Sequence, residues 1–160
     1  MRKLIIGVMG PSDASESATK QARELGRLIA KEGWLLLSGG MASGVMDAAN
    51  RGAHEERGTT IGILPTDDSS LWSKEIDIPI VTKMGSGRNF INALSSEVLV
   101  AVGMSAGTST EVAFAIQLGK PVILMENSEE NEAFFRKMGK KVYASKTAKE
   151  TVNLIKKLLG

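Results

Sequence analysis

Short apolar runs rich in Val, Ile and Leu alternate with amphipathic segments along most of the chain. Such runs are typical of buried strands when glycine or proline closes them. They predict strands at residues 4–9, 34–37, 59–64, 78–81, 97–102, 122–125 and 141–143.

Between these runs, hydrophobic residues recur at helical spacing. In the first such segment the apolar residues between Ala22 and Ile29 share one face, and Ser12, Asp13 or Ser15 can cap its start. Comparable spacing predicts helices over residues 44–57, 88–94, 109–118, 131–138 and 147–159. Residues 66–76 have the composition of an irregular surface loop.

Alternating strand and helix patterns indicate βαβ units and therefore an α/β fold, with a doubly wound, mostly parallel sheet and helices on both faces. The chain of 160 residues is long enough for one compact domain, over residues 1–160. In such sheets, ligands bind at the carboxyl ends of the strands. We therefore expect function in the loops that follow strands, at residues 10–13, 38–44, 65–68 and 103–108.

Composition and charge exclude several classes of function. A formal net charge of +2 marks the chain as a binder of neither nucleic acid nor an anionic membrane. The absence of cysteine excludes disulfides, thiol catalysis and cysteine-bound metal, and it fits a cytoplasmic protein. Because His54 is the single histidine, no metal site is expected. No apolar stretch approaches the roughly 18 residues that span a membrane.

The loop after the second predicted strand, SGGMASG, has the composition of an anion site. Gly39 and Gly40 allow main-chain N–H groups to converge, and the helix that follows adds its free N-terminal donors. A tight turn that merely requires glycine is the alternative. The candidate binding residues here are Ser38, Gly39, Gly40, Met41 and Gly44, and the loop after the first strand adds Gly10, Pro11 and Ser12.

The loop GMSAGTST has the same features after a later strand, because Gly103 and Gly107 permit close backbone approach and Ser105 and Thr108 offer hydroxyls. It lacks the Gly-Lys-Ser/Thr ending of a P-loop, and no stretch of the chain has the GxGxxG dinucleotide pattern. ATP-driven phosphoryl transfer and nicotinamide chemistry are thus disfavoured. A phosphate cradle, a catalytic site and a tight turn all remain compatible with this loop.

Two charged residues stand beside these loops. Arg88 follows a glycine pair, and its planar fork of donors suits phosphate, although a solvated surface arginine fits equally. Glu111 lies in the first turns of the helix behind GMSAGTST, where it either caps helix donors or acts as a base or hydroxyl acceptor. Several methionines near loops could line a wall for a flat ring or simply fill the core: Met41, Met46, Met84 and Met104.

Two long stretches, SGGMASGVMDAANRGAHEERGTTIGILP and GRNFINALSSEVLVAVGMSAGTSTEVAFAIQLGKPVIL, together resemble the Lonely Guy and molybdenum-cofactor carrier superfamily. Many of its members were once labelled "possible lysine decarboxylase". The resemblance spans roughly residues 5–125 and its motifs come in the right order. It implies a Rossmann-like domain, in a homodimer or homotetramer, that binds a phosphate-bearing ligand at the strand ends.

The superfamily has a hydrolase branch and a carrier branch. The hydrolases cut the N-glycosidic bond of AMP or cytokinin nucleotides, and their catalytic arginine and glutamate match Arg88 and Glu111. Asn89 stands where they have lysine, and Gly103-Met104-Ser105 stands where they have Pro-Gly-Gly. The carrier branch, with an Arg-Asn pair and a looser loop before Gly-Thr-x-x-Glu, is closer.

The resemblance thus favours a carrier for a phosphorylated nucleotide- or pterin-like ligand, such as the molybdenum cofactor (a pterin with a terminal phosphate) or a nucleotide monophosphate. A phosphoribohydrolase that requires no cofactor, with Arg88 and Glu111 catalytic, and a nucleotide-sensing module are the alternatives; lysine decarboxylase is rejected. The ligand-binding residues expected from the second motif are Arg88, Asn89, Gly103, Ser105, Ala106, Gly107, Thr108 and Glu111.

Overall fold

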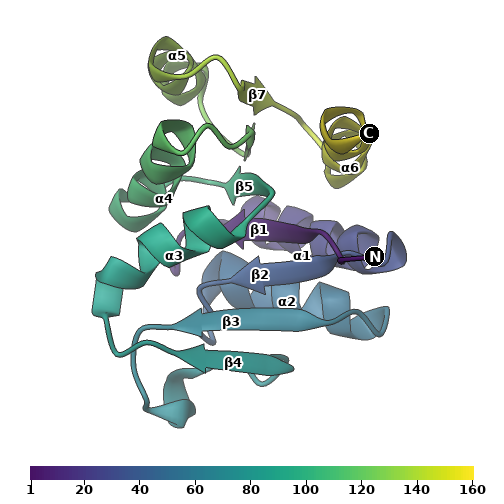
Figure 1. The fold of residues 1–160 in the computed structure, drawn as a ribbon, viewed down its shortest axis with the longest axis vertical. Helices are drawn as coiled ribbons and strands as arrows, with labels where there is room; N and C mark the ends of the chain where they lie inside the picture. Colours follow the sequence, from purple (N-terminus) through teal and green to yellow (C-terminus); the bar gives the residue numbers. More distant parts are fainter.

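A seven-stranded sheet, parallel throughout, runs through the computed structural model, which describes residues 1–160 (Figure 1). The strand order is β4-β3-β2-β1-β5-β6-β7. The strands are β1 (Ile5–Met9), β2 (Leu35–Ser38), β3 (Thr60–Leu64), β4 (Ile78–Val81), β5 (Val98–Val102), β6 (Val122–Met125) and β7 (Val142–Ala144). Strand order reverses between β1 and β5, so the crevice that binds ligands in such folds lies between their carboxyl ends.

Helices cover both faces of the sheet, which confirms the doubly wound α/β fold. One face packs against α1 (Glu16–Lys31), α2 (Gly44–Glu55) and α6 (Ala148–Leu159), and the other against α3 (Arg88–Ser95), α4 (Ala106–Gln117) and α5 (Glu129–Met138) (Figure 1). The two hydrophobic cores lie on opposite sides of the strands, because alternate residues of each strand point to opposite faces. No helix combines the length and the apolar character needed to cross a bilayer.

The predicted strands and helices all exist, but several begin elsewhere. Ser15 caps α1, where its hydroxyl accepts from the Ala18 amide at 3.1 Å. The helices α4 and α5 start earlier than expected, because Ser105 and Ser128 serve as their N-caps. The predicted loop over residues 66–76 contains one short 3₁₀ turn, Ser69–Leu71.

The helices α1 and α2 approach each other closely because each presents a glycine to the other's backbone. A Cβ on Gly26 would lie 2.1 Å from the carbonyl oxygen of Ala49, and a Cβ on Gly52 would lie 1.9 Å from that of Arg23. Neither position therefore accepts a larger residue without a backbone shift. This packing anchors α2, whose first turn stands beside the crevice.

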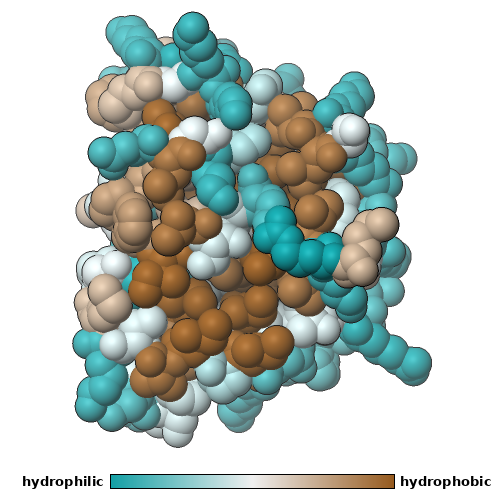
Figure 2. Space-filling model, in the orientation of Figure 1, coloured by the Kyte–Doolittle hydropathy of each residue, from teal (hydrophilic) through white to brown (hydrophobic).

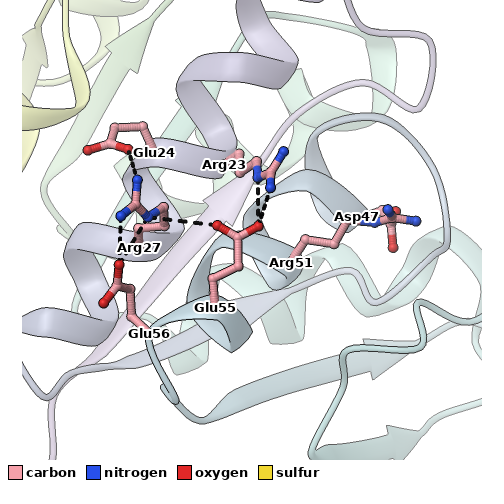
Figure 3. Close-up of polar contacts among 7 residues, drawn as sticks. All are labelled: Arg23, Glu24, Arg27, Asp47, Arg51, Glu55 and Glu56. Atoms are coloured by element: carbon pink, nitrogen blue, oxygen red, sulfur yellow. Dashed lines mark hydrogen bonds and ion pairs between the residues drawn. The ribbon is translucent and has the colours of Figure 1, made fainter.

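Ion pairs join the exposed side of the same two helices. Figure 3 shows Arg23 and Arg27 of α1 directed at Glu55 and Glu56 at the end of α2. The Arg23 Nε–Glu55 Oε1 and Arg27 Nη2–Glu56 Oε1 distances are 2.8 and 2.7 Å. These pairs are solvent-exposed, so each contributes little to stability, and we assign the network a structural role.

The opposite face of the sheet is less completely covered. α3 is the helix that lies over its β1–β4 half, and hydrophobic side chains gather on the surface there (Figures 1 and 2). The exposed apolar side chains of this face, which we call the β4–α3 face, are Ile78, Ile80, Phe90 and Leu94, each between 40 and 49% exposed.

Candidate functional site

A polar cavity of about 140 Å³ opens at the carboxyl edge of the sheet. It lies at the reversal of strand order, because its walls come from the ends of β1 and β2 and from the starts of α2, α3 and α4. Its twelve lining residues are Met9, Gly10, Ser12, Gly39, Met46, Ser86, Arg88, Asn89, Ser105, Gly107, Thr108 and Glu111. Nine of these are candidates that the sequence predicts, drawn from four separate segments.

Arg88, the first residue of α3, links the walls of the cavity. Its Nε donates to the carbonyl of Ile63 at 2.9 Å, its Nη2 to that of Gly39 at 3.3 Å, and its Nη1 to Asn89 Oδ1 at 2.8 Å. The remaining N–H groups of the guanidinium are free for a ligand. Burial lowers the pKa of Arg88, whereas the nearby Glu111 raises it.

The close approach of Arg88 depends on the absence of a side chain at Gly39. A Cβ there would lie 2.9 Å from Arg88 Nη2 and 2.8 Å from the sulfur of Met46. The glycine after β2 is therefore needed to admit the arginine. This requirement is separate from any contact that the Gly39 amide makes with a ligand.

Glu111 of α4 is a buried acid, 7% exposed, on the other wall. Its Oε2 accepts a hydrogen bond from Asn92 Nδ2 at 2.7 Å, and Arg88 acts on the carboxylate through its charge without a hydrogen bond. Burial raises the pKa of Glu111 to about 7, against smaller opposing effects of the Asn92 hydrogen bond and the Arg88 charge. At neutral pH this carboxyl therefore exists in both protonation states.

The N-terminus of α4 supplies further donors. The hydroxyl of Ser105 accepts from the Thr108 amide at 3.2 Å, which satisfies one free N–H of the first turn. The amides of Ala106 and Gly107 donate to no protein group. Asn89 holds this turn against α3 through a 3.0 Å hydrogen bond to Thr110 Oγ1. The positive end of the helix dipole and the free amide of Gly107, which lines the cavity, thus belong to the same site as Arg88.

Seven predicted residues do not line the cavity: Pro11, Ser38, Gly40, Met41, Gly44, Gly103 and Ala106. Ser38 is fully buried and bonds to Asn50, and Met41 pairs with Trp72 in an isolated bridge. Gly40, Gly44 and Gly103 have φ values between 53° and 77°, so they shape turns that other residues disfavour. At these three glycines the backbone conformation by itself favours glycine, whether or not the loop contacts a ligand.

Three lining residues were not among the predicted binding residues. Met46 was considered for an apolar wall and does line the cavity, whereas Met9 and Ser86 had no such signal. Met9 ends β1 with its side chain buried, and Ser86 belongs to the 3₁₀ turn Gly85–Gly87 just before Arg88. A rule that extends each candidate loop by one residue on its strand side would have found Met9.

Chemically, this arrangement can bind an anion and can exchange a proton. Arg88 and the α4 amides attract negative charge, and the serine and threonine hydroxyls add neutral hydrogen bonds. A carboxyl with a pKa of about 7 also suits general acid–base chemistry near neutral pH. Geometry alone is compatible with either use.

Fold and cavity together define a Rossmann-like α/β protein with a polar site at its topological switch point. The chain belongs to the SLOG cluster4 family, whose family model matches residues 3–154. The resemblance expected from the Arg88-Asn89 and Gly107-Thr108-x-x-Glu111 motifs is thereby confirmed.

Solved structures with similar folds extend this result. The molybdenum cofactor binding protein of the phototrophic bacterium Rippkaea orientalis is 44% identical, with a TM-score of 0.96 over 100% of this chain and 99% of that one. The molybdenum cofactor carrier protein of Chlamydomonas reinhardtii is 48% identical, with a TM-score of 0.94 over 99% of both chains. By sequence, the chain is also similar to an uncharacterized protein of Archaeoglobus fulgidus, with 39% identity over 122 residues, 76% of this chain and 80% of that one.

Proposed function

We propose that this protein is a carrier that binds the molybdenum cofactor, with the phosphate of the pterin in the cavity at the β1–β5 switch. The main support is identity of 44 and 48%, over practically the full length, to proteins described as binding or carrying that cofactor. The cavity adds physical support, because it combines one arginine, free helix amides and hydroxyls.

The size of the cavity indicates how such a ligand would sit. Sites that enclose a whole drug-sized ligand have volumes of about 300–1,000 Å³. The cavity of about 140 Å³ is about half of the lower end of that range. It therefore accommodates a phosphate and the atoms next to it, while the flat ring system lies at or beyond the mouth. Release of the intact cofactor then requires no large opening of the fold.

Cofactor retention tests this proposal. The purified protein is mixed with molybdenum cofactor under anaerobic conditions and passed through a gel-filtration column, and molybdenum and pterin are measured in the protein peak. We expect Arg88→Ala to weaken retention by about tenfold to a hundredfold, since charge-assisted hydrogen bonds are worth about 1.5–3 kcal/mol. Arg136→Ala, in the exposed part of α5, is the matched control and should retain the cofactor. Arg88→Lys keeps the charge without the planar fork and should give an intermediate result.

Hydrolysis is the competing activity, and the pKa of Glu111 is the observation that favours it. Incubation with AMP, followed by chromatography for free adenine, separates the two functions. We expect no adenine from the carrier. Adenine release that Glu111→Ala abolishes would overturn the carrier proposal in favour of a phosphoribohydrolase.

We also propose that the chain forms a homodimer or homotetramer through the β4–α3 face. Contiguous exposed apolar surface of this kind marks interaction sites (Figure 2). The Thr82 amide donates to the Leu64 carbonyl of β3. Because alternate amides of a strand point to opposite sides, the amide positions 79 and 81 of β4 face away from β3, and Pro79 has no N–H to offer there. Face packing is therefore favoured over addition of strand to strand.

Sedimentation velocity measures this association. Leu94→Glu should shift the protein toward the 17.0 kDa monomer, because it places a charge in the apolar contact. Lys157→Glu, a charge change at an exposed position of α6, should leave the assembly intact. A wild-type protein that sediments as a monomer at all concentrations would contradict the proposal.

A further inference from the structure

Among the residues that line the cavity, Arg88 and Glu111 are the charged pair. The loop after β1 contributes Met9, Gly10 and Ser12, and the start of α2 contributes Met46. The start of α4 contributes Ser105, Gly107 and Thr108, and none of these seven residues carries a charge. A bound phosphate group would therefore experience one fixed positive side chain and one acid. The charge of that acid decides the electrostatic balance of the site.

The cavity is too small to keep a phosphate away from Glu111. The cavity of about 140 Å³ has both Arg88 and Glu111 in its walls, so a phosphate bound in it lies close to both side chains. A negative group close to a buried carboxylate such as Glu111 disfavours the ionised form of that carboxylate. Arg88 attracts both groups, but burial outweighs its effect on Glu111 and holds the pKa of that carboxyl above its ordinary value.

One side of the Glu111 carboxyl is already occupied. Oε2 accepts the 2.7 Å hydrogen bond from Asn92, a fully buried residue, whereas Oε1 has no hydrogen-bond partner in the protein. Because Glu111 lines the cavity, its free oxygen is available to the ligand. A protonated carboxyl could donate from that oxygen to a phosphate, whereas an ionised carboxylate could only repel it.

We propose that Glu111 takes up one proton from the solvent when the phosphate group of the ligand enters the cavity, and that the neutral acid then donates a hydrogen bond to the ligand. Binding is thus coupled to protonation, and a rise in pH promotes release. This inference rests on the proposed function, since it concerns the phosphate-binding role of the same cavity.

The ligand-free protein is already suited to this behaviour. Burial raises the pKa of Glu111 from 4.5 to about 7, and an entering anion raises it further. Above pH 7 the free site must gain a proton in order to bind, so affinity falls as pH rises. Below pH 7 the free site is mostly protonated, and affinity should be nearly constant. An ionised Glu111 that accepts from a ligand hydroxyl would instead make affinity rise with pH.

Isothermal titration calorimetry between pH 6 and 8.5, with sulfate and AMP as probes, tests the coupling. Sulfate remains a dianion throughout this range, so it separates the titration of the protein from that of the ligand. We expect the affinity of the wild type to fall by about five- to tenfold for each pH unit above 7. Titrations at pH 8 in buffers of different ionisation enthalpy should show uptake of about one proton per ligand bound.

Two variants complete the experiment. Glu111→Gln keeps the size of the side chain and an oxygen for Asn92, so it should bind both probes with an affinity that does not change with pH. Glu129→Gln replaces an exposed glutamate outside the cavity and should behave as the wild type. Thermal melts of each variant establish that it is folded.

The possible failures are distinguishable. If the wild type binds sulfate or AMP with unchanged affinity from pH 6 to 8.5, or without proton uptake, the proton coupling is wrong while the anion site stands. A pH dependence that persists in Glu111→Gln assigns the proton to another group and also overturns this inference. If neither probe binds at any pH, the cavity is not a phosphate site, and the placement of the cofactor phosphate fails together with the coupling.

Discussion

The loops after β2 and after β5 are closely similar as sequences and differ in the folded protein. Each is rich in glycine and serine, each follows a buried strand, and each leads into a helix of 12 residues, α2 or α4. For both, the sequence left an anion cradle and a tight turn as alternatives. In the structure, the start of α4 opens into the cavity with free amides, whereas the start of α2 is largely covered by other parts of the chain.

Two neighbouring segments cover the start of α2. The carbonyl of Pro11 accepts from the Val45 amide at 3.2 Å, which uses one of the donors that an anion would need. On the other side, the Ala42 amide donates to Leu71 at 2.9 Å, and Ser73 donates to Gly40 at 2.8 Å. The loop after β2 thus contributes Gly39 to the cavity, while its helix contributes the Met46 side chain in place of an anion site.

The acids of the two helices differ in the same way. Asp47 of α2 is satisfied by Arg51 at 2.7 Å and by the Ser73 hydroxyl at 2.7 Å. Glu111 of α4 has only Asn92 and is buried beside the cavity. Similar local sequences therefore produce a paired structural acid in one helix and a desolvated acid at the site in the other. What surrounds a helix start decides whether its polar groups remain available.

Replacing the first glycine of each helix by alanine should give the largest difference in stability between the two loops. Gly44 has a φ of +53°, and a Cβ there would lie 2.1 Å from the Pro11 carbonyl oxygen. We expect Gly44→Ala to lower the free energy of unfolding by roughly 2–4 kcal/mol, from backbone strain and overpacking. Urea denaturation measures this change.

Gly107→Ala is the matched substitution at α4. Its nearest neighbour, Asn89 Nδ2, would lie 3.9 Å from the new Cβ. Stability should therefore be unchanged or higher by up to about 1 kcal/mol, since alanine is the better helix former. Sulfate binding should weaken, because the methyl group faces the cavity. Equal losses of stability in the two variants would refute the contrast between a covered and an open helix start.

The pH dependence of stability should distinguish the two acids. The folded protein holds a proton on Glu111 up to about pH 7, whereas the unfolded chain loses it near 4.5. The unfolded state thus binds fewer protons between these values, and the stability of the ligand-free protein should fall by roughly 3 kcal/mol as pH rises through this window. Above pH 7 this contribution is constant.

Denaturation curves at a series of pH values show whether this loss belongs to Glu111. Glu111→Gln should remove most of the decline between pH 4.5 and 7. Asp47→Asn loses contacts to Arg51 and Ser73 and should be less stable, but it should keep the decline. A wild-type stability that rises through the window would show that Glu111 is not desolvated in solution.

The N-cap serines give the smallest expected difference. Ser105 accepts the Thr108 amide through its hydroxyl, whereas Ser43 makes no such hydrogen bond at the start of α2. Ser105→Ala should therefore cost about 1 kcal/mol of stability, and Ser43→Ala a few tenths at most. Thermal melts of the two variants in parallel measure the contrast, and a larger effect at Ser43 would reverse the assignment.

Local pattern was sufficient to predict the fold class. Strands such as Val98–Val102 and helices such as Glu16–Lys31 were predictable because hydrophobic period and turn residues are properties of adjacent positions. Helix starts were less predictable, since either Ser105 or Ser109 could have capped α4 by composition. The location of Arg88 and Glu111 at one site could be predicted from the rule that the carboxyl ends of parallel strands share an edge, together with the family resemblance.

Long-range contacts decided the rest of the site. Nothing near Gly44 in the chain indicates that Pro11 covers it, and nothing near Glu111 indicates that it is buried with Asn92 as its single partner. Met9 and Ser86 line the cavity only because separate crossovers bring β1 and α3 together. Glycine spacing and helix phase are local and can be inferred from the chain alone. Free donors, desolvation and a raised pKa depend on what packs against each group, and folding alone establishes that.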